Sequence, residues 1–334
     1  MPRHLRFQSA DWSPHLITAR CTQGHSLLRP DDTNALITAT LARALERHRG
    51  EVELHHYVIM SNHIHLLIST KDAHAKARFM CYFSGNLARE LCRHWNTRDH
   101  IWEGRYHSHE LLDETALIDA YKYIFKNSVK EGLVDHPRDW PGLHGYAQLC
   151  AGAVLIGRWL DRTRWGYAER TQRGRERGEQ AYMREAPVTL TQPRCWGEWT
   201  QDEYHERCER WCAEAVQEAL ESRARRLAEA RRNLGERGVS FDVAVERASA
   251  DLTSIGADAV RAEPVFVARP VSRSPRPLCR SGCDKRFAEF MAGYRAFQSA
   301  FLHTSSLLRA AVARGERLPH VKFPQGGVPL YIGT

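Results

Sequence analysis

Hydrophobic positions in the first third of the chain follow two patterns, short runs typical of strands and longer stretches with helical spacing. The short runs predict strands at residues 15–21, 55–68 and 101–108, with a polar break in the second run that indicates a β-hairpin. The longer stretches predict helices at residues 33–48 and 73–95. Strand, helix, two strands, helix, strand is the ferredoxin-like order, so we expect an α+β fold with an antiparallel sheet and helices on one face.

The second arm of the predicted hairpin carries two histidines that are separated by one residue. Because side chains alternate along a strand, His63 and His65 point to one face of the sheet while the hydrophobic residues between and after them point into the core. Two imidazoles on one face can hold one metal ion, although a His-x-His pair taken alone is more often made of ordinary strand residues. The turn before the pair and a tyrosine-bearing helix downstream favour the metal interpretation.

That downstream helix is predicted to end at Gly132. Tyr123 and Asn127 lie one turn apart in it, separated by about 40° around the helix axis, so they present to the same place. Tyr121 points about 200° away from Tyr123, and we expect it to pack in the core. The sequence therefore singles out Tyr123 as the tyrosine that can share a site with Asn127.

Two segments together resemble the REP-associated tyrosine transposases of the HUH single-tyrosine transposase superfamily. The first is Met60-Ser61-Asn62-His63-Ile64-His65-Leu66-Leu67. The second is Tyr123-Ile124-Phe125-Lys126-Asn127-Ser128-Val129-Lys130-Glu131-Gly132-Leu133-Val134, which is similar to the family signature Tyr-Ile-x-x-Asn-Pro-Val-Arg-Ala-Gly-Leu-Val. The resemblance covers roughly residues 15 to 146 and departs from the family at Ser128, where the family has proline, and at Glu131, where it has alanine.

The resemblance implies a metal-dependent endonuclease and strand transferase that acts on single-stranded DNA, with hairpin-forming repeats as substrates. In this family His63, His65 and Asn127 would hold Mg²⁺ or Mn²⁺ while Tyr123 attacks phosphorus and forms a 5′-phosphotyrosine. Three alternatives stay open. They are an HUH relaxase or replication initiator, a domesticated and non-catalytic protein that binds DNA hairpins or regulates transcription, and a metallohydrolase without a covalent tyrosine step.

Composition adds mild support for a nucleic-acid partner. Among 334 residues, lysine and arginine outnumber the acids by 48 to 40, which gives a net charge of +8. Nine cysteines without a secretory signal, and the lack of an apolar run long enough to span a bilayer, favour a cytoplasmic protein with no membrane partner. The sequence leaves the oligomeric state open between a monomer and a homodimer.

Three regions are predicted, namely a catalytic domain at residues 1–150, a charged helical region at 151–262, and a linker with a C-terminal helix at 263–334. The second region contains an arginine-dense stretch with interleaved aromatic residues, a pattern typical of either a DNA-backbone interface or a solvated helical face. It also contains a long amphipathic helix at 201–234, and a proline-rich linker follows at 264–277. The candidate DNA-binding residues are Arg105, Arg158, Arg170, Arg173 and Arg175.

Overall fold

A computed structural model of the protein describes residues 7–236 and 278–313. Its strands are β1 (Ser13–Arg20), β2 (Val52–Met60), β3 (His63–Thr70), β4 (His107–Leu111), β5 (Ile156–Leu160), β6 (Met183–Pro187) and β7 (Cys279–Arg280). Its α-helices are α1 (Asn34–Arg47), α2 (Ala73–His94), α3 (Glu114–Phe125), α4 (Asn127–Lys130), α5 (Tyr146–Leu149), α6 (Arg162–Ala168), α7 (Gln172–Arg177), α8 (Gln201–Glu236) and α10 (Asp284–Ala313). Short 3₁₀ turns occur at Thr22–Gly24, Pro137–Asp139, Glu179–Tyr182 and Arg194–Trp196.

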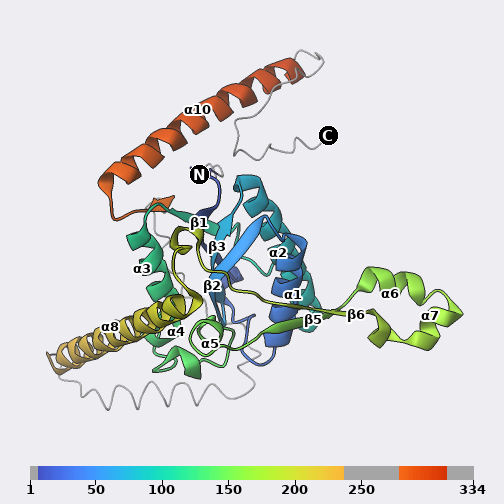
Figure 1. The fold of residues 1–334 in the computed structure, drawn as a ribbon, viewed down its shortest axis with the longest axis horizontal. Coiled ribbons are helices and arrows are strands. Elements are labelled where there is room, and N and C mark those ends of the chain that lie inside the picture. Colours follow the sequence, from blue (N-terminus) through green and yellow to red (C-terminus); the bar gives the residue numbers. More distant parts are fainter. Residues whose placement is uncertain (1–6, 237–277, 314–334) are drawn as a thin grey trace.

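Five strands form the central sheet in the order β2-β3-β1-β4-β7 (Figure 1). The first four strands pair antiparallel, with β2 and β3 as the predicted hairpin, and their order along the chain with α1 and α2 confirms the ferredoxin-like prediction. The fifth strand, β7, comes from the C-terminal part of the chain and pairs parallel with β4. A segment far away in the sequence therefore forms one edge of the sheet.

The predicted strand at 101–108 is wrong in its position, because the strand that pairs with β1 is β4. Trp102 makes only an isolated bridge to Cys21. The hydrophobic side chains that suggested a strand pack on the helical layer instead: Ile101 is buried in the core and the indole nitrogen of Trp102 donates to the Ser84 carbonyl of α2 at 3.0 Å. The hydrophobic pattern here anchors a loop, and β4 follows it.

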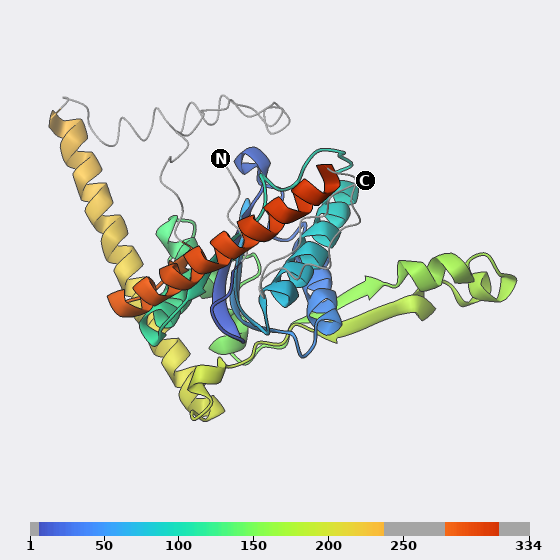
Figure 2. The ribbon, with the colours of Figure 1, turned by 90° about the horizontal axis from the view of Figure 1, so that it is seen from above.

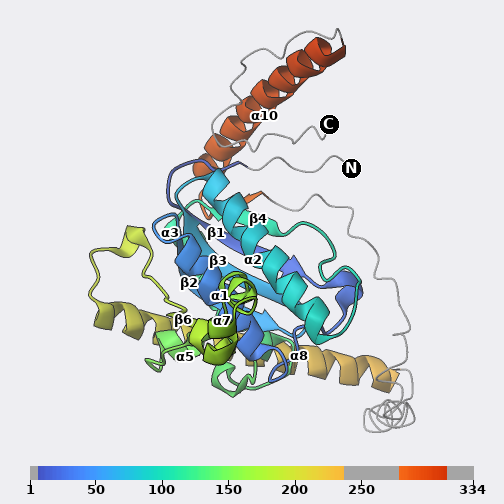
Figure 3. The same ribbon diagram turned by 90° about the vertical axis from the view of Figure 1, so that its right-hand side faces the viewer.

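Helices cover both faces of the sheet (Figure 2). On one face α1 and α2 pack against strand residues that include Ile17, Ile64 and Leu66, as the ferredoxin-like order requires. The prediction placed no helix on the face that carries the histidines, but α3 packs on it around Leu16 and Leu67, and the first half of α8 packs against α3. Figure 3 views the molecule from the side on which α1 and α2 lie, so these two helices are in front of the sheet. The candidate site is therefore formed between the sheet and α3.

Residues 151–187, predicted to be helical, contain the two-stranded hairpin β5–β6, which carries α6 and α7 at its tip and projects from the domain (Figure 1). Strand β5 lies directly on α1. A Cβ atom at Gly157 would lie only 2.6 Å from the Ala42 Cβ atom and from the Thr38 carbonyl oxygen, so only glycine allows this close packing. The last part of the predicted helical region, residues 237–262, lies outside the described residues, as does the proline-rich linker at 264–277.

Replacing Gly157 with valine tests this packing. The added side chain has to push β5 away from α1, and overpacking of this kind costs about 1–3 kcal/mol. We expect faster limited proteolysis between residues 158 and 184, together with a small decrease in melting temperature. Gly166→Ala, at a position where a Cβ meets nothing within 4 Å, is the matched control and should leave proteolysis unchanged. Equal proteolysis of both variants and the wild-type protein would contradict the packing.

The predicted amphipathic helix is confirmed as α8, which buries Tyr204, Cys208 and Trp211 against α3. The C-terminal helix is α10, whose aromatic residues pack with Phe7. Neither of these long helices, nor any other helix within the two described ranges, has the length and hydrophobicity needed to cross a membrane.

Candidate active site

His63, His65 and Tyr123 form one cluster where α3 crosses β3. The ring centroids of the two histidines are 4.9 Å apart, and those of His65 and Tyr123 are 5.0 Å apart. The Tyr123 hydroxyl lies 3.3 Å from Nε2 of His65. The structure thus brings the candidate nucleophile into hydrogen-bonding distance of a candidate metal ligand.

Both imidazoles are held through their Nδ1 atoms. Nδ1 of His63 donates to the Asn62 side-chain oxygen at 2.7 Å, and Nδ1 of His65 pairs with the Thr18 hydroxyl at 2.9 Å. Partners of this kind fix the ring orientation and the tautomer of metal-binding histidines. With the proton on Nδ1, the Nε2 lone pair of each ring remains available to a metal ion.

Asn127 completes the cluster from the end of α3. Helix α3 ends at Phe125 and α4 begins at Asn127, so the tightened turn between them keeps Asn127 one turn after Tyr123. The Asn127 side chain is 2% exposed, and its Oδ1 atom has no hydrogen-bond partner among the described residues. Buried oxygens without a partner are rare. The Asn127 side chain interacts with both His63 and Tyr123, and an amide oxygen beside imidazole suits a divalent cation, so this residue set fits a metal ion.

The candidate metal ligands include no carboxylate and no thiolate group. Within residues 7–236 and 278–313, no three His, Cys, Asp or Glu side chains are grouped so that they could hold a metal ion. The two cysteines of α8, Cys208 and Cys212, are buried in the core between α3 and α8. The candidate metal site therefore consists of two histidines and an amide oxygen.

Burial controls the ionisation of the cluster. It lowers the pKa of His63 to about 4 and holds the pKa of His65 well below its usual value, so both rings are neutral near pH 7. Neutral imidazole is the form that binds metals. Burial also raises the pKa of the Tyr123 phenol, an effect that the nearby Arg280 and Arg20 guanidinium groups partly offset. The phenol is therefore protonated at neutral pH in this structure.

The prediction that Tyr121 packs in the core is confirmed. Tyr121 is fully buried, its hydroxyl lies 2.7 Å from the hydroxyl of Tyr204 in α8, and its ring stacks on His56. His56 itself is an interior strand residue that is fully buried. Tyr121 and Tyr123 therefore have separate environments, and only Tyr123 faces the histidine pair.

Three residues near the cluster were not identified from the sequence. Thr18 and Asn62 hold the histidine rings, and the polar Thr18 between the hydrophobic Ile17 and Ala19 of β1 was the signal that could have revealed the first. The third is Arg280 of β7, whose guanidinium carbon is 5.8 Å from the centroid of the Tyr123 ring. No motif or spacing links Arg280 to the cluster, because a two-residue strand leaves no pattern in the sequence.

The candidate DNA-binding arginines lie away from this cluster. Arg105 lines a hollow of about 260 Å³ beside α2. Arg158 pairs with Glu185 across the β5–β6 hairpin at 3.1 Å. The other three, Arg170, Arg173 and Arg175, belong to the projecting tip of that hairpin (Figure 1).

Comparison with known proteins agrees with this geometry. Residues 14–127 match the family model described as "Transposase IS200 like". The matched segment contains all four residues of the cluster, and the resemblance to single-tyrosine transposases inferred from the two motifs is confirmed for this part of the chain. The family match and the cluster therefore coincide in the same part of the chain.

A curated protein of Haemophilus influenzae, named as a REP-associated tyrosine transposase, is 31% identical over 93 residues, which are 25% of this chain and 53% of that protein. The chain thus spans about half the length of this relative. A solved REP-associated tyrosine transposase bound to a REP hairpin shares 16% identity with a TM-score of 0.37, over 45% of this chain and 86% of that one. A solved protein named as a transposase from Deinococcus radiodurans shares 20% identity with a TM-score of 0.27, over 37% and 95%.

Proposed function

We propose that this protein is a metal-dependent endonuclease and strand transferase for single-stranded DNA that works through a 5′-phosphotyrosine on Tyr123. One observation carries the proposal. The Tyr123 hydroxyl lies 3.3 Å from Nε2 of His65, in the segment that matches the transposase family and beside the partnerless oxygen of Asn127. A tyrosine hydroxyl beside a candidate metal site can attack a phosphate that the metal ion polarises.

His63, His65 and Asn127 are the residues that would hold the metal, with Mg²⁺ or Mn²⁺ as the expected ion. Two imidazoles and one amide oxygen leave coordination positions for oxygens of the DNA. When bound, such an ion polarises the scissile phosphate and offsets its negative charge. Thr18 and Asn62 would keep the Nε2 atoms of the two rings aimed at it.

The chemical step consists of one bond formed and one broken. The Tyr123 oxygen forms a bond to phosphorus, and its proton leaves to solvent. The bond between phosphorus and the 3′ oxygen breaks, its electron pair stays on that oxygen, and the oxygen takes a proton to become a free 3′-hydroxyl. Because the phosphotyrosine linkage replaces the phosphodiester, attack by another 3′-hydroxyl reverses the step and joins strands without ATP.

The proposed substrate is single-stranded DNA that folds into hairpins at short repeats. The curated relative is named for an association with REP repeats, and the net charge of +8 suits a polyanionic partner. The proposed place of action is the cytoplasm, where such DNA would be found. An apolar membrane surface has no part in this proposal.

The experiment uses a labelled single-stranded hairpin oligonucleotide, taken from repeats that flank the gene, with Mg²⁺ or Mn²⁺ present. The expected products are a free 3′-hydroxyl fragment and a protein band shifted by the attached 5′ fragment in a denaturing gel. Cleavage without a covalent band would indicate a metallohydrolase. Tight hairpin binding without cleavage would indicate a non-catalytic hairpin-binding protein.

A further inference from the structure

The first inference concerns β7, the short strand that the C-terminal part of the chain adds to the sheet. Cys279 and Arg280 lie opposite Glu110 and Leu111 of β4. The backbone bonds from Glu110 N to the Leu278 oxygen, 3.1 Å, and from Leu112 N to the Arg280 oxygen, 3.0 Å, fix this register. The position of the Arg280 backbone is thus determined by the same sheet that positions the histidines.

The register also decides which face of the sheet Arg280 points to. Paired residues in neighbouring strands project from the same face, and Leu111, the partner of Arg280, is buried against α3. The Arg280 side chain therefore projects towards the helix that carries Tyr123. Its guanidinium carbon lies 5.8 Å from the centroid of the Tyr123 ring.

Asp113 ties β7 to α3. Its carboxylate caps α3 by accepting from the Ala116 backbone N–H at 2.8 Å, and it also accepts from the Gly282 N–H at 2.8 Å and from the Ser281 hydroxyl. One side chain thus joins the start of the Tyr123 helix to the loop that follows Arg280. This link keeps Arg280 and Tyr123 in a defined relation even though 156 residues separate them in the sequence.

The charge of Arg280 is not balanced by an acidic side chain in the part of the chain that the structure describes. Across the described residues, no carboxylate lies within ion-pair distance of its guanidinium group, although the side chain is half-buried. A half-buried arginine beside a nucleophile is suited to bind a phosphate, because the guanidinium group matches two phosphate oxygens at once. The anion that would complete this site is the one that Tyr123 attacks.

We propose that Arg280 binds a non-bridging oxygen of the scissile phosphate and stabilises the negative charge that grows on it during attack. This inference rests on the proposed function. It makes Arg280 a catalytic residue supplied by the C-terminal part of the chain, outside the segment at 14–127 that matches the family model. The bonds formed and broken are the same as in the proposed chemical step, because the Arg280 guanidinium group keeps its proton throughout.

Arg280→Gln tests the proposal in the full chain. We expect the single-turnover rate of covalent adduct formation to fall by about 10²–10³-fold, the usual loss when one donor to a reacting oxyanion is removed, with hairpin binding changed by less than about threefold. Arg295→Gln removes the same charge from an exposed position of α10 and should leave the rate unchanged. An Arg280→Gln rate equal to the wild-type rate would overturn the proposal.

A second substrate separates phosphate binding from a structural effect. A methylphosphonate at the scissile position carries no negative charge, so the rate on it should be insensitive to Arg280→Gln. An equal loss on both substrates would assign Arg280 to a structural role and would also overturn the proposal. Failure of the wild-type protein to form any adduct would instead contradict the proposed function, so the two failures are distinguishable.

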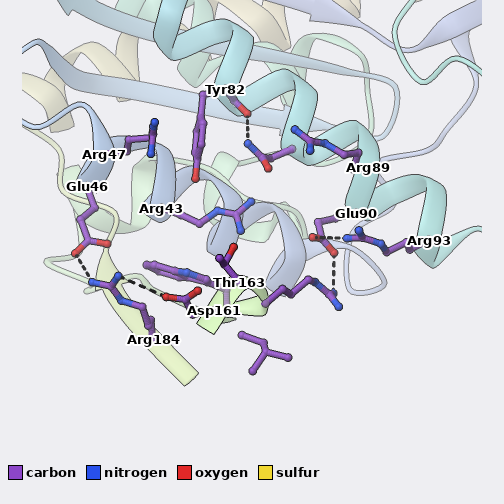
Figure 4. A pocket seen from close by; sticks show the side chains of 14 residues that line it. Arg43, Glu46, Arg47, Tyr82, Arg89, Glu90, Arg93, Asp161, Thr163 and Arg184 are labelled. Atoms are coloured by element: carbon purple, nitrogen blue, oxygen red, sulfur yellow. Dashed lines mark hydrogen bonds and ion pairs between the residues drawn. The ribbon is translucent and has the colours of Figure 1, made fainter. Parts of the chain in front are cut away.

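A different observation carries a second inference, on the face of the sheet covered by α1 and α2. A hollow of about 500 Å³ lies between these helices and the β5–β6 hairpin (Figure 4). Its charged lining residues are Arg43, Arg47, Arg89, Arg93, Arg162, Arg184, Glu46, Glu90 and Asp161. Six arginines against three acids leave a charge of +3 in the lining.

The three acids of the lining pair with three of its six arginines, namely Arg93, Arg162 and Arg184. Glu90 pairs with Arg93 at 2.9 Å and with Arg162 at 3.2 Å. Arg184 pairs with the other two acids, at 3.6 Å and 3.9 Å (Figure 4).

Arg43, Arg47 and Arg89 have no carboxylate partner among the described residues. The guanidinium carbons of Arg43 and Arg47 lie 5.7 Å and 4.9 Å from the Tyr82 ring centroid. Figure 4 shows these side chains on the helical walls of the hollow. Three arginines without a carboxylate partner among the described residues give this wall a positive charge.

We infer that this wall binds the phosphodiester backbone of the DNA substrate outside the cleavage position. The inference rests on the proposed function. A DNA hairpin is larger than the cluster around Tyr123, and contacts to its phosphates away from that cluster set its orientation on the protein. The stacking of two arginines with Tyr82 holds them in place and so reduces the entropy lost on binding.

The test compares two double variants with the same change in charge. Arg47→Gln/Arg89→Gln should lower the slope of log K against log salt for hairpin binding by about 0.7–0.9 for each phosphate that the variant no longer binds. Arg232→Gln/Arg295→Gln, at exposed positions of α8 and α10, should leave it unchanged. Equal slopes for both variants, or no change in the first, would overturn the inference. Adduct formation by Tyr123 at saturating DNA should persist in both variants, which separates this result from the proposed function.

Discussion

Tyr123→Phe should abolish the covalent adduct. The variant loses one oxygen atom, and that atom forms the bond to phosphorus, so we expect the single-turnover rate to fall by at least about 10⁴-fold. Stability should change little, because Tyr123 is only partly buried and its hydroxyl lies at the long distance of 3.3 Å from His65. Hairpin binding should remain close to that of the wild-type protein. Rates are measured from the shifted protein band over time.

Tyr121→Phe is the matched control, since it removes the same atom from the same helix two residues earlier. Its hydroxyl pairs with that of Tyr204 in the core, so its loss should cost about 1 kcal/mol of stability while the adduct rate stays within about threefold of wild type. An active Tyr123→Phe variant, or an inactive but folded Tyr121→Phe variant, would contradict the assignment of the nucleophile.

Replacing both metal-ligand candidates should remove cleavage but retain DNA binding. In His63→Gln/His65→Gln the side chains keep much of their volume, but the imidazole nitrogens are removed. We expect a decrease of about 10³-fold or more in cleavage, which corresponds to several kcal/mol of transition-state stabilisation. Titration with Mn²⁺, followed by its paramagnetic resonance signal, should show that the variant no longer binds the ion.

Thr18→Val provides a graded comparison. It removes only the hydroxyl that holds Nδ1 of His65, and removal of such a partner lowers metal affinity or activity about 10–100-fold. Full cleavage by protein treated with EDTA, or Mn²⁺ binding that is unchanged in the double variant, would contradict the role of the histidines.

The parts of the structure that follow from local pattern could be predicted from the sequence. Alternation along β3 correctly separates the face of His63 and His65 from the core face, and helical spacing places Tyr121 and Tyr123 on different sides of α3. These relations depend only on residues close in the sequence. For the same reason the order of the first four strands and two helices could be predicted.

Features that depend on distant pairing could not be predicted. Arg280 reaches Tyr123 only because a two-residue strand joins β4, and nothing in its neighbourhood indicates that partner. The β5–β6 hairpin could not be predicted because its arginines and aromatic residues fit a helical face equally well. Its packing on α1 depends on Gly157, which has no side chain and therefore leaves no hydrophobic pattern. The strand predicted at 101–108 failed because Ile101 and Trp102 pack on the α2 layer.

The most direct measurement is the mass of the peptide to which the DNA is attached. The adduct formed on a single-stranded hairpin is digested with nuclease and protease, and the peptide that carries the remaining nucleotide is sequenced by mass spectrometry. We predict that the modification is on Tyr123, in the peptide that also contains Ile124 and Phe125. A nucleotide on Tyr121 or on any other residue, or a cleavage reaction that leaves no modified peptide, would contradict the account.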